Sequence, residues 1–246
     1  MASVEKLDCC NVPITNLSPE DLSEQILEVA ASGKAEHIVL LSLWDLLRAR
    51  KHNEYRTFVQ QAAMVIPISK SIIGGLKFLH GKTVPRYMPF DFFIKTLHAL
   101  ESRGKSLYLL GGRPRTLKIA ERNIRHTFPG LRIVGRCAGY YKKNEEAPIL
   151  LAIKKSSPTL LLVGRGVPGD ENWLVRNEAS LGPGIHIWCS DLFDIFAERR
   201  HRPSRKAFNH GLEWVGYCLR NPLKLFRIFP YLKFKILLLY YKIRYY

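Results

Sequence analysis

The chain has 246 residues, of which 47% are hydrophobic, and carries a formal net charge of +17. This length fits one large domain or one domain with an appendage, and the apolar content is sufficient for a sizeable core. Five cysteines, an odd number without any C-x-x-C spacing, suggest neither a disulfide framework nor a zinc site. Because no run approaches the roughly 18–20 apolar residues of a membrane span, and no apolar leader opens the chain, we expect a cytoplasmic protein.

Apolar runs and stretches of helical periodicity alternate along the chain, after a strand or hairpin expected within residues 4–14. We expect a helix from Pro19, with Ser18 as its N-cap. The expected helices are Pro19–Ser32, Leu43–Arg50, Asn53–Ala62, Ser71–His80, Asp91–Arg103, Leu117–Phe128, Glu145–Lys155 and Glu171–Ser180. The expected strands are His37–Ser42, Met64–Pro67, Ser106–Leu110, Leu131–Val134, Thr159–Gly164 and Gly184–Cys189. This alternation predicts an α/β fold, a three-layer, Rossmann-like and mostly parallel sheet over residues 1–197.

The turn after the strand Ser106–Leu110 is the first candidate binding element. It reads Gly111-Gly112-Arg113 and opens a helix with Pro114 in its first turn. Ligands of parallel α/β sheets bind at the carboxyl ends of the strands. Bare glycine N–H groups beside one cation suit a phosphate, although two glycines also serve a tight turn alone.

A second glycine-rich turn follows the strand Thr159–Gly164 and forms the other candidate wall of a cleft. Here Arg165 supplies a cation, while Asp170 and Glu171 either bind sugar hydroxyls or favour the positive end of the next helix. Asp91, after a loop, is a candidate general base or ligand contact, and an N-cap is the alternative.

Positive charge is concentrated at the end of the chain. Residues 199–246 contain 12 Lys and Arg against one acid, a net +11, whereas the preceding residues contain 26 against 20, a net +6. Such a segment binds a polyanion, either nucleic acid or an anionic membrane surface.

Within this basic appendage, residues 198–246, cations alternate with bulky apolar residues. Arg220, Lys224 and Arg227 fall on one helical face, and Lys233 and Lys235 stand among aliphatic and aromatic residues. This pattern is typical of a helix lying in a bilayer interface. Packing of the apolar residues on the α/β body is the alternative. Nucleic acid fits less well, because the run Ile236–Leu239 is poorly suited to phosphate grooves.

Several motifs, in order along nearly the whole chain, resemble the WecG/TagA/CpsF glycosyltransferases, glycosyltransferase family 26. They are Leu109-Leu-Gly-Gly-Arg-Pro114, Pro129-Gly-Leu-Arg-Ile-Val-Gly135, Leu160-Leu-Leu-Val-Gly-Arg-Gly-Val-Pro168 with Glu171 and Trp173, Phe193-Asp194, Arg202-Pro-Ser204, Gly211-Leu-Glu-Trp214 and Asn221-Pro222.

The resemblance implies an inverting, metal-independent transfer of a HexNAc or hexose sugar without a cofactor. The donor is a UDP-sugar and the acceptor a polyprenyl-diphosphate-linked glycan, at the cytoplasmic membrane face, in surface polysaccharide or cell-wall synthesis. Assembly into a homo-oligomer is left open by the sequence. We assign donor binding to Ser42, Gly111, Gly112, Arg113, Gly139, Tyr140, Gly164, Arg165, Asp170 and Glu171. Contact with the diphosphate or the membrane is assigned to Arg220, Lys224, Arg227, Lys233 and Lys235.

The chain departs from the family pattern in the catalytic half. The family's proposed base is an Asp at the position of Ile68, and the family's Thr-Pro-Asn is here Leu40-Leu41-Ser42. A family Gln is replaced by Asp170, while the downstream acidic position is kept as Asp91. Either Asp91, or next Asp170, serves as the base, or the acceptor chemistry differs, or the chain is a catalytically impaired homologue that binds a nucleotide-sugar or a partner.

Overall fold

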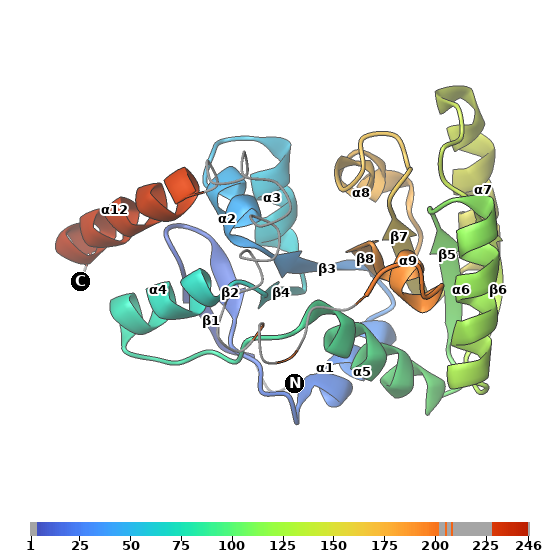
Figure 1. Ribbon diagram of the computed structural model, residues 1–246, viewed down its shortest axis with the longest axis horizontal. Helices are drawn as coiled ribbons and strands as arrows, with labels where there is room; N and C mark the ends of the chain where they lie inside the picture. The colour runs from blue at the N-terminus through green and yellow to red at the C-terminus, as the bar shows by residue number, and fades with distance from the viewer. Residues whose placement is uncertain (1–3, 202–204, 206–207, 209–227, 246) are drawn as a thin grey trace. The chain divides into compact units, whose positions relative to one another are not determined.

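The computed structural model describes residues 4–201, 205, 208 and 228–245. Its strands form a six-stranded sheet of order β4-β3-β8-β7-β5-β6 and a two-stranded sheet, β1-β2 (Figure 1). The pairings β3–β8, β8–β7, β7–β5 and β5–β6 are parallel, so the predicted α/β class with a mostly parallel sheet is confirmed.

The strands and helices follow one another much as the sequence predicts. The strands are β1 (Lys6–Asp8), β2 (Pro13–Thr15), β3 (Ala35–Leu41), β4 (Met64–Pro67), β5 (Ser106–Leu110), β6 (Arg132–Cys137), β7 (Leu160–Gly164) and β8 (Gly184–Ser190). The helices are α1 (Leu22–Ala31), α2 (Leu43–Ala49), α3 (Glu54–Gln61), α4 (Lys70–His80), α5 (Pro89–Glu101), α6 (Pro114–Thr127), α7 (Glu146–Ser156), α8 (Asn172–Asn177), α9 (Leu192–Phe196) and α12 (Ile228–Tyr245), with short 3₁₀ turns at Lys143–Glu145 and Glu178–Ser180.

Two details of the prediction are wrong. Helix α1 begins only at Leu22, after Asp21, so Ser18 is not its N-cap. Strand β6 extends to Cys137, whereas the prediction ends with the apolar run at Val134. The prediction stops early because β6 is an edge strand whose residues alternate between exposed and half-buried. A half-exposed edge strand carries polar residues that an apolar run does not reveal.

The chain forms two compact units. The first comprises residues 1–19, 40–89 and the described part of 202–246, and the second comprises residues 20–39 and 90–201. The predicted division into residues 1–197 and 198–246 stays a prediction.

In the second unit, strands β5 and β7 are buried along their whole length, as expected for parallel strands covered on both faces. Helices α6 and α9 lie side by side, and the Asn123 side-chain amide donates to the Phe196 carbonyl at 2.7 Å (Figure 1). This unit therefore holds the carboxyl ends of β5 to β8 on a rigid base.

In the first unit, α12 packs on α4 through one face. Phe234, Leu238 and Tyr241 are buried, and an ideal Cβ on Gly75 of α4 would lie 2.9 Å from Phe234 Cζ. The Lys242 ammonium donates to the Leu79 carbonyl at 3.0 Å, which fixes the end of α12.

This close approach predicts opposite effects of alanine at two adjacent glycines. Gly75→Ala should lower the free energy of unfolding by about 1–3 kcal/mol, because the new methyl group overlaps Phe234 and Leu238. Gly74→Ala, where a Cβ meets nothing within 4 Å, should raise it by about 0.5–1 kcal/mol, since alanine favours the helix. Thermal and urea unfolding measure both, and equal effects would contradict the packing.

A second prediction concerns pH. Burial between neighbouring strands, with His37 of β3 opposite, lowers the pKa of His186 to about 4 from its ordinary 6.5. The unfolded chain therefore takes up a proton as the pH falls below about 6.5, while the folded chain does not until about pH 4. We expect His186 to contribute a loss of about 3 kcal/mol of stability between these values, and none above pH 7. Urea unfolding of the unaltered chain and of His186→Asn measures this slope; an unchanged slope in the variant would contradict it.

Candidate nucleotide-diphosphate site

Three glycine loops meet at the carboxyl ends of β5, β6 and β7 in the second unit. Gly111 N–H donates to the Cys137 carbonyl at 2.9 Å, and Gly112 N–H donates to the Arg165 carbonyl at 2.6 Å. Gly139 N–H in turn donates to the Gly112 carbonyl at 2.8 Å. The expectation that Gly111 and Gly112 offer bare N–H groups to a phosphate is therefore wrong: these N–H groups join the loops to one another.

Glycine is required in these loops because the backbones touch. Gly111 has φ +114°, and a Cβ there would lie 2.5 Å from the Gly164 carbonyl oxygen. A Cβ on Gly139 would lie 2.9 Å from the backbone of Gly166, and one on Gly164 would lie 2.7 Å from the ring of Phe193. No side chain fits between these backbones without displacing them, so the glycines fix the height of the loops above the sheet.

The side chains beside the glycines are cationic and aromatic. Arg113, exposed at the start of α6, has its guanidinium carbon 6.0 Å from the centre of the Tyr140 ring. The Tyr140 N–H donates to the Gly166 carbonyl at 2.5 Å, and the Tyr140 backbone has φ +62°. Tyr140 nevertheless remains 65% exposed. A fixed backbone thus presents an accessible aromatic face beside a cation.

Arg165 is held in place by a carboxylate. Its Nε lies 2.8 Å from Asp191 Oδ1, and Arg200 pairs with the other Asp191 oxygen. Asp191 precedes α9 but makes no side-chain cap bond, so its role is to bind these cations. Because the Arg165 side chain is 54% exposed, one part of its guanidinium stays accessible to a ligand.

The predicted carboxylates lie on separate elements of this unit. Asp170 has φ +49° in the loop after β7, and its Oδ1 accepts from the Gly166 N–H at 3.5 Å. Glu171 precedes α8 and makes no side-chain cap bond. Asp91 lies in the first turn of α5, which begins at Pro89, so the N-cap alternative for Asp91 is wrong.

Ser42 and Ile68, two other positions that the sequence singles out, belong to the first unit. Ser42 is the N-cap of α2: its hydroxyl accepts from the Asp45 N–H at 3.4 Å and contacts the Asp45 carboxylate at 2.5 Å. Burial raises the pKa of Asp45. Ile68 follows β4 and donates its N–H to the Leu41 carbonyl at 3.1 Å, and Ser69 accepts from the Leu43 N–H at 3.0 Å.

Arg86 is a candidate that the sequence did not indicate. Its Nε donates to the Ile68 carbonyl at 2.8 Å, and its guanidinium carbon lies 3.7 Å from the centre of the Phe208 ring. A cation therefore lies beside the backbone of Ile68, the residue that the resemblance aligns with the family's Asp. The only sequence signal is an arginine after Pro85 in a loop, which is too common to single out.

The appendage is described only in part. Lys233 and Lys235 are exposed on α12. Arg220, Lys224 and Arg227 lie outside the described residues, as do the motifs Arg202–Ser204, Gly211–Trp214 and Asn221-Pro222.

The described ranges contain neither a membrane-spanning helix nor a cluster of metal-binding side chains. Across these ranges, no helix combines the length and apolarity that crossing a bilayer requires. The described part of the chain also contains no group of three or more His, Cys, Asp or Glu side chains that could hold a metal ion. Metal-independent transfer stays a prediction.

A parallel α/β unit with glycine loops, cations and an exposed aromatic ring at the carboxyl ends of its strands is typical of enzymes that bind nucleotides. The model of the WecG/TagA/CpsF glycosyl transferase family matches residues 7–246. The chain therefore belongs to this family of glycosyltransferases, as its motifs predict.

One curated relative is the N-acetylglucosaminyldiphosphoundecaprenol N-acetyl-beta-D-mannosaminyltransferase of Bacillus spizizenii. It is 21% identical over 176 residues, which cover 72% of this chain and 68% of the relative.

Proposed function

We propose that this protein transfers a sugar from a UDP-sugar to a glycan carried on a polyprenyl diphosphate, in cell-wall or surface-polysaccharide synthesis. The observation that carries the proposal is the set of glycine loops with Arg113, Arg165 and the exposed ring of Tyr140. Family membership supports the reaction class, and the acceptor in the relative's name supports the acceptor class.

The chemistry of a UDP-sugar fits these side chains. The nucleobase is a flat ring that can stack on the exposed face of Tyr140, while a diphosphate needs cations near it. Arg113 and Arg165 are the available donors, because the N–H groups of Gly111 and Gly112 are already bonded. The glycines therefore act by bringing the loops together, and the arginines by binding charge.

In the proposed reaction, a carboxylate accepts the proton of an acceptor hydroxyl. The hydroxyl oxygen attacks the anomeric carbon, and the bond from that carbon to the diphosphate oxygen breaks with its electron pair. UDP leaves as an anion that the arginines stabilise. Inversion at the anomeric carbon follows from a single displacement of this kind. We assign the base to Asp91 first and to Asp170 second, because Ile68 cannot accept a proton.

The replacement at Ile68 also favours a second candidate function. A chain without the family's carboxylate could bind the nucleotide-sugar and a partner protein without turnover. Calorimetry with UDP and an assay of UDP release separate the two candidates: binding without release supports the second.

Carboxamide variants test the assignment of the base. Asp91→Asn should lower kcat for UDP release by about 10²–10⁴-fold and leave UDP affinity unchanged, because only proton transfer is lost. Asp170→Asn tests the second candidate and should lower kcat less than Asp91→Asn does. Undiminished turnover by Asp91→Asn would remove Asp91 as the base. Turnover that appears only in Ile68→Asp would instead support the impaired homologue.

We further propose that α12 lies against the cytoplasmic face of the membrane. Its buried face packs on α4, whereas Leu232, Ile236, Leu239 and Ile243 are each more than half exposed. Lysines 233 and 235 stand beside this apolar face, as in helices that lie in a bilayer interface. This arrangement brings the protein to an acceptor whose lipid stays in the bilayer.

Charge reversal on α12 tests the membrane proposal. Lys235→Glu should weaken binding to vesicles containing phosphatidylglycerol by about 30-fold, since each unit of charge near anionic lipid contributes about 1 kcal/mol and the reversal changes two units. Lys118→Glu on exposed α6 is the control and should bind as the unaltered chain does. Vesicle flotation at physiological salt measures both variants, and equal binding by all three proteins would argue against contact through α12.

A further inference from the structure

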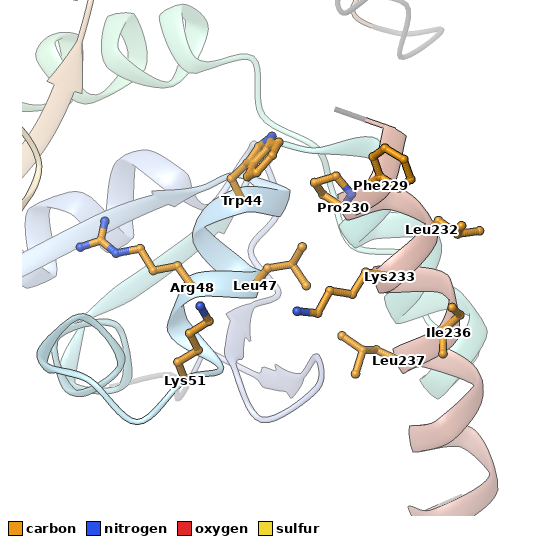
Figure 2. A pocket seen from close by; sticks show the side chains of 10 residues that line it. All are labelled: Trp44, Leu47, Arg48, Lys51, Phe229, Pro230, Leu232, Lys233, Ile236 and Leu237. Atoms are coloured by element: carbon orange, nitrogen blue, oxygen red, sulfur yellow. The ribbon is translucent and has the colours of Figure 1, made fainter. Parts of the chain in front are cut away.

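A groove of about 750 Å³ lies in the first unit between α12 and α2. Figure 2 shows the residues that line this α2–α12 groove: Trp44, Leu47, Arg48, Lys51, Phe229, Pro230, Leu232, Lys233, Ile236 and Leu237. Its volume is within the roughly 300–1,000 Å³ of sites that bind small organic ligands.

The lining combines hydrocarbon with positive charge. Most of the lining side chains are aliphatic or aromatic, and the charged ones are three cations without a carboxylate. The Arg48 guanidinium lies 3.8 Å from the centre of the Tyr55 ring and extends away from α12 (Figure 2). Lys233 instead points from α12 toward Leu47 and Lys51, and both lysines line the groove (Figure 2).

Two like charges that line one apolar groove favour an amphiphilic anion. Its phosphate groups would lie between Lys51 and Lys233, where they relieve the repulsion of the two ammonium groups. Its hydrocarbon would cover Trp44, Ile236 and Leu237, of which Trp44 is 49% and Ile236 62% exposed. Removing these apolar surfaces from water supplies the rest of the affinity.

We propose that the α2–α12 groove binds the first isoprenoid units and the diphosphate of a polyprenyl diphosphate, the lipid carrier of the acceptor. This inference rests on the proposed function for the identity of the lipid. A diphosphate carries its negative charges directly at the end of the hydrocarbon, which matches two lysines at an apolar groove. A phospholipid places a glycerol ester between its phosphate and its chains, and apart from the Trp44 indole N–H the lining residues offer no neutral polar side chain for those esters.

Two lysines of α12 that have the same predicted role from sequence differ in their position relative to the groove. Lys233 lines it and Lys235 does not, although both are exposed on α12. Similarly, Ile236 lines it, whereas Leu239, 55% exposed on the same helix, does not. These two pairs supply matched variants that change the exposed surface of α12 equally.

The test is binding of geranylgeranyl diphosphate to the full chain in solution, without vesicles or donor, by calorimetry and by the fluorescence of Trp44. Lys233→Gln and Ile236→Asp should each weaken binding by about tenfold or more, whereas Lys235→Gln and Leu239→Asp should leave it unchanged. Trp44→Phe should abolish the ligand-induced fluorescence change. An equal loss of affinity for geranylgeranyl diphosphate in a variant and in its matched control would overturn the proposal.

Further ligands identify the chemistry that is recognised. Geranylgeraniol and inorganic diphosphate should each bind far more weakly than geranylgeranyl diphosphate, because each supplies half of the contacts. Lysophosphatidylglycerol that binds as tightly as the prenyl diphosphate would show a phospholipid site and overturn the assignment.

The assay needs no turnover, so its failure is distinguishable from failure of the proposed function. If UDP release occurs but the prenyl diphosphate does not bind in this way, only the groove assignment is lost. If the proposed function holds, Ile236→Asp should also raise the KM for a prenyl-linked acceptor, and leave the affinity for UDP unchanged.

Discussion

The candidate site depends on backbone-to-backbone contact between glycine loops. Gly111 approaches Gly164, and Gly139 approaches Gly166, at distances that leave no room for a Cβ atom. Hydrogen bonds from the N–H groups of Gly111, Gly112 and Gly139 to carbonyls of neighbouring loops fix this arrangement. The loops thereby become a rigid surface from which Arg113, Arg165 and Tyr140 project. Preorganised cations of this kind stabilise a departing diphosphate without reorganising during the reaction.

Much of the fold can be predicted from the sequence because buried parallel strands are short, continuous apolar runs. Ser106–Leu110 was expected and observed with the same bounds, and it is buried throughout. The edge strand β6 could be predicted only as far as Val134, since its later residues alternate between exposed and half-buried positions and form no apolar run. The start of α1 was misplaced because a Ser-Pro-Glu-Asp run also suits a turn, and here it precedes the helix.

The candidate site could be predicted in position but not in detail. Glycine turns at the ends of strands mark where a ligand binds in a parallel sheet. The acceptors of their N–H groups come from other loops, however, so the sequence could not show that Gly111 and Gly112 are already satisfied. The same applies to Arg86 beside Ile68 and to the α2–α12 groove, which join residues far apart in the chain.

The two units suggest a division of tasks for a transferase that works on a membrane-bound acceptor. The second unit carries the loops suited to a nucleotide diphosphate, and the first carries α12 with its exposed apolar face and groove. In this account the soluble donor and the lipid carrier are bound by separate surfaces of one chain. In the same account, the departure at Ile68 moves the role of the base to another carboxylate and leaves both surfaces intact.

The central claim is that the glycine loops form the donor site, and a crystal structure of the full chain with UDP bound tests it most directly. The account predicts the diphosphate in contact with the guanidinium groups of Arg113 and Arg165, with the base stacked on the Tyr140 ring. A UDP molecule bound elsewhere, with these three side chains free of ligand, would contradict it.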